Sequence, residues 1–329
     1  MNEAPTTGTP TRRMGLKQWL GWIVGLSLLV VLLARMPLRE VPHMLAVLPA
    51  RVVLITFTGL LCSYLLRAAR LQAVLPPGVP GPGAPRTLGL PWGVVKVIFL
   101  HNGAINLIPM RAGELTFPWL CERHLGLPKS VAMATLVWMR LQDLVVLASL
   151  GVFLLPGLAL SWRLGLWGTG LAALWLLRQW ALRHPRSTDA STTLLPALGS
   201  VRQALADPTH HSWTAWVFST ANWCVKLLAG AVLLSALTGT PLPHGLTGAL
   251  GGELAAVLPV QGPAGLGTYE AGVSLALHWA HAASAGGVML AQGAAVWAAL
   301  ILHLMMLCSA LCCAALAPWI PATRDARPT

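Results

Sequence analysis

The chain has 329 residues, of which 56% are hydrophobic and 10% are charged, and its 22 Lys and Arg against 10 Asp and Glu give a formal net charge of +12. Soluble domains carry about 25% charged residues, so a water-soluble globule is excluded and an all-α, polytopic membrane protein is indicated. The basic residues punctuate apolar runs and form no stripe interleaved with aromatic residues. The charge therefore predicts positive-inside topology and affinity for anionic lipid headgroups, and no nucleic-acid partner is expected.

Six apolar segments are long enough, or nearly so, to cross a hydrocarbon core of about 30 Å. They are residues 16–35, about 50–69, 130–156, 162–180, 212–238 and 287–317. Tryptophans and basic residues stand at their ends, as is typical of membrane–water interfaces. We expect a single transmembrane domain over residues 16–318, between disordered tails at residues 1–15 and 319–329.

Two further apolar stretches, near residues 92–125 and 244–284, are interrupted at their centres by a proline and a glycine-containing polar turn. Backbone that is not helical survives at membrane depth only when it is buried in protein or lines a wet cavity. We therefore predict two re-entrant helical hairpins, with eight full spans as the alternative. The residues expected to form the turns are Pro109, Gly113, Pro259, Gly262, Pro263, Gly265 and Gly267.

The distribution of basic residues predicts an orientation. With six crossings, both termini and the loops at 67–91 and 181–211 fall on one side, which the positive-inside rule makes cytoplasmic. Arg35, Arg39 and Arg51 would then lie outside and oppose this scheme. The first hairpin would enter from the cytoplasm and the second from outside, an arrangement of opposed half-helices that is typical of inverted-repeat transporters.

Eight ionisable residues lie inside apolar segments, four cations and four anions: Lys96, Arg111, Glu114, Arg140, Asp143, Lys226, Glu253 and Glu270. Each costs roughly 3 kcal/mol near the centre of a bilayer, so we expect these side chains to point inward, paired or hydrated, along a path for a lipid headgroup. Arg140 and Asp143 share a helical face and either satisfy each other or bind phosphate and relay protons. Lys226 has no local partner, and we expect one of the acids to reach it.

Both hairpin turns carry polar residues. Arg111 and Glu114 flank the first turn, where unpaired backbone N–H groups beside an arginine attract an anionic headgroup. Glu253 and Glu270 flank the second turn, where they either cap the backbone or couple ions or protons. Asn106 either binds the backbone freed by Pro109 or lines the cavity.

The sequence does not indicate metal binding or enzymatic catalysis. The cysteines and histidines lack the spacing of a metal site, and the motifs of phosphate-binding loops, serine hydrolases and zinc proteases are absent from the sequence. We expect no metal, no cofactor and no enzymatic activity.

Three segments carry a resemblance to a known family: residues 106–114, 138–143 and 258–270. They resemble the transmembrane region of lysylphosphatidylglycerol synthases, a flippase-like integral membrane family, and the resemblance extends over about residues 15–318. One departure is Phe117-Pro118, which stands where family members often place an arginine. The residues given hold no soluble aminoacyl-transferase domain, so we expect the chain not to synthesise such a lipid itself.

The resemblance implies that the protein translocates a polar or anionic phospholipid, glycolipid or polyprenyl-linked lipid between the leaflets of a bacterial cytoplasmic membrane. The implied partners are membrane lipids and a separate lipid-modifying enzyme. Two alternatives stay open: a membrane scaffold for such a synthase or glycosyltransferase, and an intramembrane enzyme acting on lipid-linked substrates.

Overall fold

The structure is a computed structural model of the chain. It describes residues 48–79, 86–87, 89–154, 157–183, 196–257, 263–283 and 292–320. The crossing predicted at residues 16–35, the N-terminal tail and most of the C-terminal tail lie outside the described residues.

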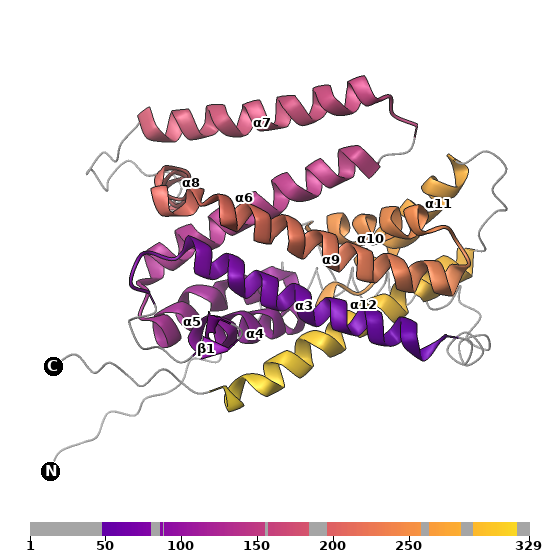
Figure 1. Ribbon diagram of the computed structural model, residues 1–329, viewed down its shortest axis with the longest axis horizontal. Coiled ribbons are helices and arrows are strands. Elements are labelled where there is room, and N and C mark those ends of the chain that lie inside the picture. The colour runs from indigo at the N-terminus through magenta and orange to yellow at the C-terminus, as the bar shows by residue number, and fades with distance from the viewer. Residues whose placement is uncertain are drawn as a thin grey trace, which may run out of the picture.

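Long helices make up most of the described chain (Figure 1). They are α3 (Ala50–Val74), α6 (Lys129–Leu154), α7 (Leu160–Arg183), α9 (Trp213–Thr238) and α12 (Gln292–Leu316). Four of these, α3, α6, α9 and α12 with the short turn that follows it, are long and apolar enough to cross a membrane. The predicted all-α membrane bundle is confirmed. Helix α7 coincides with the crossing predicted at 162–180 but is not among those four, because arginine, glycine and tryptophan lower its hydropathy.

Prolines end two helices where the sequence predicts a break. Helix α3 ends at Val74, and Leu75 takes an extended conformation before Pro76. In the same way α4 (Trp92–Leu107) stops at Ile108, whose φ of −91° and ψ of 120° are those of extended backbone. A residue before proline is disfavoured in the α conformation because the proline ring collides with its backbone. The break therefore follows from local sequence.

Each of the two interrupted stretches folds into a helical hairpin. The first consists of α4, the 3₁₀ turn η2 (Pro109–Leu115) and α5 (Thr116–Leu125). The second consists of α10 (Leu242–Val257), η4 (Pro263–Gly265) and α11 (Thr268–Ala282). Their arms have 16, 10, 16 and 15 residues, fewer than the roughly 20 that a full crossing needs.

The two hairpins approach each other from opposite ends of the molecule. In Figure 1, α4 and α5 lie at the left end of the long axis, and α10 and α11 lie at the right end. Their tips, η2 and η4, are in contact with one another. Residues of the long helices α3, α6, α9 and α12 lie beside the place where the tips meet.

The remaining elements are short and peripheral. They are β1 (Arg86–Thr87), β2 (Leu90–Pro91), α8 (Pro196–Ala206), η3 (Pro208–His211) and η5 (Ala317–Trp319). The two strands form a small antiparallel ladder. Helix α8 lies within the predicted 181–211 loop, beside α7, whose described residues are exposed except at Ala181 and a few partly covered positions.

Candidate functional site

A cavity of about 520 Å³ lies where the two hairpins meet. Its walls come from both hairpins and from α3, α6, α9 and α12. Its lining combines aliphatic side chains with the following polar and ionisable ones: Arg67, Asn102, Asn106, Glu114, Arg140, Asp143, Trp223, Lys226, Glu253, Tyr269 and His303. Residues more than 230 positions apart in the chain therefore face one common space.

The hairpin tips fit closely against the helices beside them. A Cβ atom at Gly113 would lie 2.4 Å from the carbonyl oxygen of Ala104 on α4, which no side chain tolerates, so glycine alone fits there. Gly265 and Gly267 have φ values of 79° and 87°, in the region that glycine occupies without strain. Pro259 and Gly262 lie outside the described residues. The predicted turn positions that the structure describes thus do form the tips.

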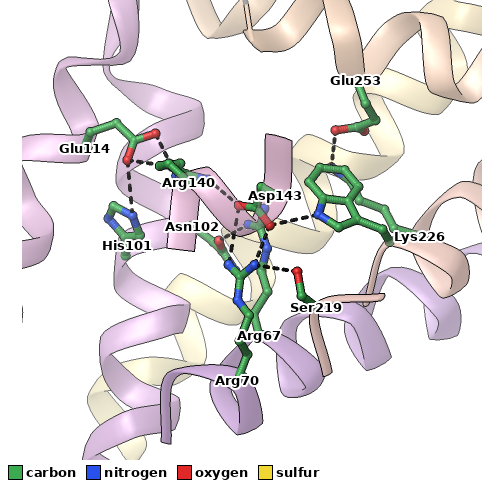
Figure 2. Close-up of polar contacts among 11 residues, drawn as sticks. Arg67, Arg70, His101, Asn102, Glu114, Arg140, Asp143, Ser219, Lys226 and Glu253 are labelled. Atoms are coloured by element: carbon green, nitrogen blue, oxygen red, sulfur yellow. Dashed lines mark hydrogen bonds and ion pairs between the residues drawn. The ribbon is translucent and has the colours of Figure 1, made fainter. Parts of the chain in front are cut away.

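Arg140 is the centre of the charged cluster on the side of the first hairpin (Figure 2). Its Nε donates to Oε2 of Glu114 at 3.1 Å, and its Nη2 lies 2.6 Å from Oε1 of the same carboxylate. Its Nη1 donates to Oδ2 of Asp143 at 3.2 Å. The predicted neighbours Arg140 and Asp143 are in contact, and Glu114 of the first hairpin joins them.

Asp143 is also bound by residues from two other helices. Arg70 on α3 forms an ion pair with it, and the indole nitrogen of Trp223 on α9 donates to its Oδ1 at 2.8 Å. Arg70 also donates to Ser219 Oγ at 3.0 Å. Arg70 and Asp143 are 3% and 5% exposed, so the carboxylate is buried but is satisfied by several donors, as a buried charge must be.

Lys226 has the acid partner that the sequence predicts. Its Nζ lies 2.7 Å from Oε2 of Glu253. The pair joins α9 to α10, the first arm of the second hairpin, and both side chains line the cavity. Which acid would reach Lys226 was left open by the sequence, and packing selects Glu253.

Glu270 lies beneath the tip of the second hairpin and pairs with a histidine. Its Oε2 accepts a hydrogen bond from the backbone N–H of Gly267 at 2.6 Å, which caps the start of α11. Its Oε1 lies 2.6 Å from Nδ1 of His303 on α12. Glu270 and His303 are 1% and 3% exposed.

Three predicted site residues remain: Lys96, Asn106 and Arg111. Lys96 is directed away from the cavity, where its Nζ donates to the carbonyl oxygen of Ile320 at 3.2 Å. Asn106 lines the cavity and donates to the carbonyl oxygen of Asn102 at 2.7 Å, which is not a carbonyl that Pro109 leaves without its helical partner. Arg111 lies in η2, and its side chain is outside what the structure describes.

Sequence reasoning missed Arg67 and Arg70, the two arginines of α3. They stand at the end of the apolar run at 50–69 and were assigned to the basic loop at 67–91, whereas the helix continues to Val74. Arg67 lines the cavity and donates from Nη1 to the side-chain oxygen of Asn102 at 2.8 Å. Within the described residues it forms no ion pair. Its spacing of three from Arg70 on one helix was the signal available in the sequence.

The cluster is therefore not electrically balanced in the way the sequence indicates. The described cations that line the cavity are Arg67, Arg140 and Lys226, and the described carboxylates are Glu114, Asp143 and Glu253. Arg70 does not line the cavity, but it pairs with Asp143 and so adds a fourth cation to the cluster. Of the eight ionisable residues expected along the path, Lys96 points elsewhere, Glu270 is paired with a histidine, and the side chain of Arg111 lies outside what the structure describes. With Arg70 counted, the described cluster has one positive charge in excess.

Comparison with known proteins identifies the family. The family model for the Lysylphosphatidylglycerol synthase TM region matches residues 18–303, which is most of the chain. The chain belongs to this family. No curated protein and no solved structure matches it.

Membership in the lysylphosphatidylglycerol synthase TM family agrees with the four apolar helices. The protein is an integral membrane protein of a family associated with lipids. The match extends from ahead of α3 to His303 and so includes both hairpins and the cavity between them. Within the part of the chain that the structure describes, no group of three or more His, Cys, Asp or Glu residues is arranged to hold a metal ion.

Proposed function

We propose that this protein is a lipid translocase that moves a lipid with a polar, anionic headgroup between the two leaflets of the membrane. The headgroup would enter the cavity between the hairpins while the acyl chains stay in the surrounding lipid. The observation that supports this proposal is the cavity of about 520 Å³ between the hairpins, whose largely apolar lining carries guanidinium, ammonium and carboxylate groups. With Arg70, which pairs with Asp143, the described charged groups of this cluster have one positive charge in excess.

The cavity walls suit such a headgroup for a physical reason. A charged group at the centre of a bilayer is costly when lipid surrounds it, and a wet cavity lined with hydrogen-bonding groups lowers that cost. Arg67 and Arg140 offer guanidinium donors, which match the oxygens of a phosphate in pairs. In this proposal Arg111 at the tip of the first hairpin adds a further phosphate contact, and Lys226 and Glu253 line the opposite wall.

Opposed hairpins also supply the means of alternating access. The two tips are in contact, the tip of the first hairpin is held to α6 by Glu114 and Arg140, and the first arm of the second hairpin is held to α9 by Glu253 and Lys226. Movement of one hairpin relative to the bundle would open the cavity toward one leaflet, as in transporters built from broken helices. We place both termini in the cytoplasm of a bacterial cell on the basis of the basic loops.

The test is translocation in proteoliposomes. The purified chain is reconstituted with acyl-labelled anionic, glycosyl and zwitterionic lipids, and loss of label from the outer leaflet is followed after addition of a quencher that does not cross the membrane. We expect flipping of anionic or glycosyl lipids and a loss of most of that rate in Arg111→Ala, with Lys129→Ala as an exposed control.

The same preparation separates the alternatives. Absence of flipping for every lipid would show that the translocase proposal is wrong. Formation of a modified lipid by the purified chain would instead support an intramembrane enzyme. An inert chain that co-purifies with a synthase or glycosyltransferase would support a scaffold.

A further inference from the structure

The contact between Glu270 and His303 places a defined number of protons inside the protein. Nε2 of His303 lies 3.0 Å from the carbonyl oxygen of Ala264. A carbonyl oxygen only accepts hydrogen bonds, so Nε2 carries a proton. Nδ1 of the same ring lies 2.6 Å from Oε1 of Glu270, and that hydrogen bond also requires one proton between the two atoms.

The second proton has two equivalent positions. It resides either on Nδ1, giving an imidazolium beside a carboxylate, or on Oε1, giving a neutral imidazole beside a carboxylic acid. Both arrangements have a net charge of zero, which suits a pair that is 1% and 3% exposed. The pair therefore holds one proton more than a neutral histidine beside a carboxylate would hold.

We propose that His303 and Glu270 form a proton-binding site whose protonation fastens the tip of the second hairpin to α12 and so couples proton binding to the opening of the cavity. With the shared proton present, α12 holds the hairpin at two points, Ala264 in η4 and Glu270 in α11. When the proton leaves to water in the cavity, the pair changes from a charge of zero to −1. The single proton left on the ring can serve Ala264 or Glu270, but not both.

The backbone conformation of Ala264 gives the loss of its hydrogen bond to His303 a structural effect. Its φ of 54° is the one positive value among the described residues other than glycine, and an alanine is disfavoured there because its Cβ crowds the backbone. The hydrogen bond from His303 holds this conformation. Once the bond is lost, η4 is free to relax, and η4 forms part of the cavity wall together with the tip of the first hairpin.

The cavity offers the proton a path to water, and charged groups in the cavity walls influence the proton-binding site. His303, Ala264 and Tyr269 all line the cavity, and the Tyr269 ring lies 4.7 Å from the His303 ring, centroid to centroid. Six charged groups from the other walls face the same space: Arg67 on α3, Glu114 on η2, Arg140 and Asp143 on α6, Lys226 on α9 and Glu253 on α10. His101 on α4 is directed instead to Thr116 and Glu114. These six groups and Arg70, which pairs with Asp143, together carry one positive charge in excess, so they attract the pair in its −1 state and make loss of the shared proton accessible.

The proton site is tested by hydrogen–deuterium exchange of the hairpin tip in the full chain. Exchange of peptides covering residues 263–271 is measured in lipid nanodiscs from pH 5.5 to 9 and corrected for the intrinsic effect of pH on exchange. We expect protection of the tip to fall about tenfold as pH rises, because one charge-assisted hydrogen bond is lost. Protection that is independent of pH over this range would overturn the proposal.

Two variants and a control make the result specific. Glu270→Gln keeps an oxygen for Gly267 and adds an N–H for Nδ1 of His303, so it imitates the protonated state, and its tip stays protected at every pH. His303→Gln removes the ring that holds the shared proton and leaves the tip less protected than in the wild type at pH 5.5. His278→Gln, whose ring bonds only within α11 among the described residues, keeps the pH dependence of the wild type. Wild-type pH dependence in Glu270→Gln would also overturn the proposal.

Coupling to transport rests on the proposed function and has its own measurement. In proteoliposomes with an imposed pH gradient, the direction of the gradient changes the flipping rate of the wild type but not that of Glu270→Gln. A flipping rate of the wild type that ignores the gradient contradicts the coupling. A chain that flips no lipid under any condition contradicts the proposed function, and the exchange measurement still decides the proton site.

Discussion

Glu114 and Arg140 join the tip of the first hairpin to α6 through two contacts between one carboxylate and one guanidinium. The distances are 3.1 Å from Nε to Oε2 and 2.6 Å from Nη2 to Oε1. A two-point contact of this kind fixes orientation as well as distance. Because the same guanidinium also donates to Asp143, one side chain sets both the position of the hairpin tip and the surroundings of the buried acid.

Replacement of Glu114 by Gln tests this contact. The amide keeps one acceptor oxygen but loses the charge, so we expect the free energy of unfolding to fall by about 1–3 kcal/mol. The measurement is thermal unfolding of the purified protein in detergent. The matched control is Glu122→Gln in the same hairpin, since Glu122 bonds Lys129 at 3.0 Å with both side chains about half exposed. An exposed pair of that kind contributes at most about 1 kcal/mol. Equal shifts in the two variants would contradict the assigned role of Glu114.

We expect substitutions of Lys226 and Glu253 to have strongly non-additive effects on the stability of the protein. Lys226→Met leaves the carboxylate of Glu253, which is 6% exposed, without its cation, and breaking a buried pair by removing one partner costs about 3–5 kcal/mol. In Lys226→Met/Glu253→Gln no uncompensated charge remains, so the double variant is expected to be more stable than Lys226→Met alone. Unfolding midpoints of the wild type, the two single variants and the double variant give the coupling energy. Additive effects would show that the two side chains do not depend on each other.

Much of the backbone could be predicted because its signals are local. The extended residue before Pro109 and the positive φ values of Gly265 and Gly267 follow from the steric properties of those residues alone. Their place within apolar stretches then predicts two hairpins. The pairing of Arg140 with Asp143 is local as well, since the two residues are three apart on one helix.

The partners of the site could not be predicted in the same way, since they depend on packing between distant segments. Arg70 and Asp143 are 73 positions apart, and Thr56 on α3 bonds the backbone of Ala229, 173 positions away. The apolar run from 50 to 69 stops short of Val74, where its helix ends, and the spacing of its two arginines does not identify their partners. His303 is likewise bound by residues distant in the chain, Glu270 and Ala264, 33 and 39 positions away.

Gly113→Ala tests the close approach of the first hairpin's tip to its own first arm. The new Cβ would lie 2.4 Å from the carbonyl oxygen of Ala104 and 2.7 Å from the Cα of Ile105. Because both neighbours are backbone atoms, η2 must move, and overpacking of this kind costs about 1–3 kcal/mol. We expect a lower unfolding midpoint and slower lipid flipping. Gly168→Ala on α7 is the control, since no atom lies within 4 Å of its added Cβ. Normal stability of Gly113→Ala would be inconsistent with the described packing of η2 on α4.

Arg67 and Arg70 lie one helical turn apart, and we expect substitution by Gln to lower stability much more at Arg70 than at Arg67. Arg70 is 3% exposed and pairs with Asp143, so Arg70→Gln removes a buried cation and is expected to cost about 3–5 kcal/mol of stability. Arg67 bonds only the side chain of Asn102 among the described residues, and its Nε is buried with no hydrogen-bond partner. Arg67→Gln is therefore expected to change stability by no more than about 1 kcal/mol.

Lipid retention separates the two variants further. If the leftover positive charge at the cavity attracts the headgroup, Arg67→Gln loses about 90% of the anionic lipid that co-purifies with the protein, a tenfold change that corresponds to one charge-assisted contact. Lipid extracted from equal amounts of wild type, Arg67→Gln and Arg67→Lys is quantified by mass spectrometry. Arg67→Lys keeps the charge and is expected to retain an intermediate amount, because an ammonium binds phosphate as a point charge without the paired donors. Wild-type retention in Arg67→Gln together with a large loss of stability would instead make Arg67 a structural residue, and the excess charge would then have no role in binding lipid.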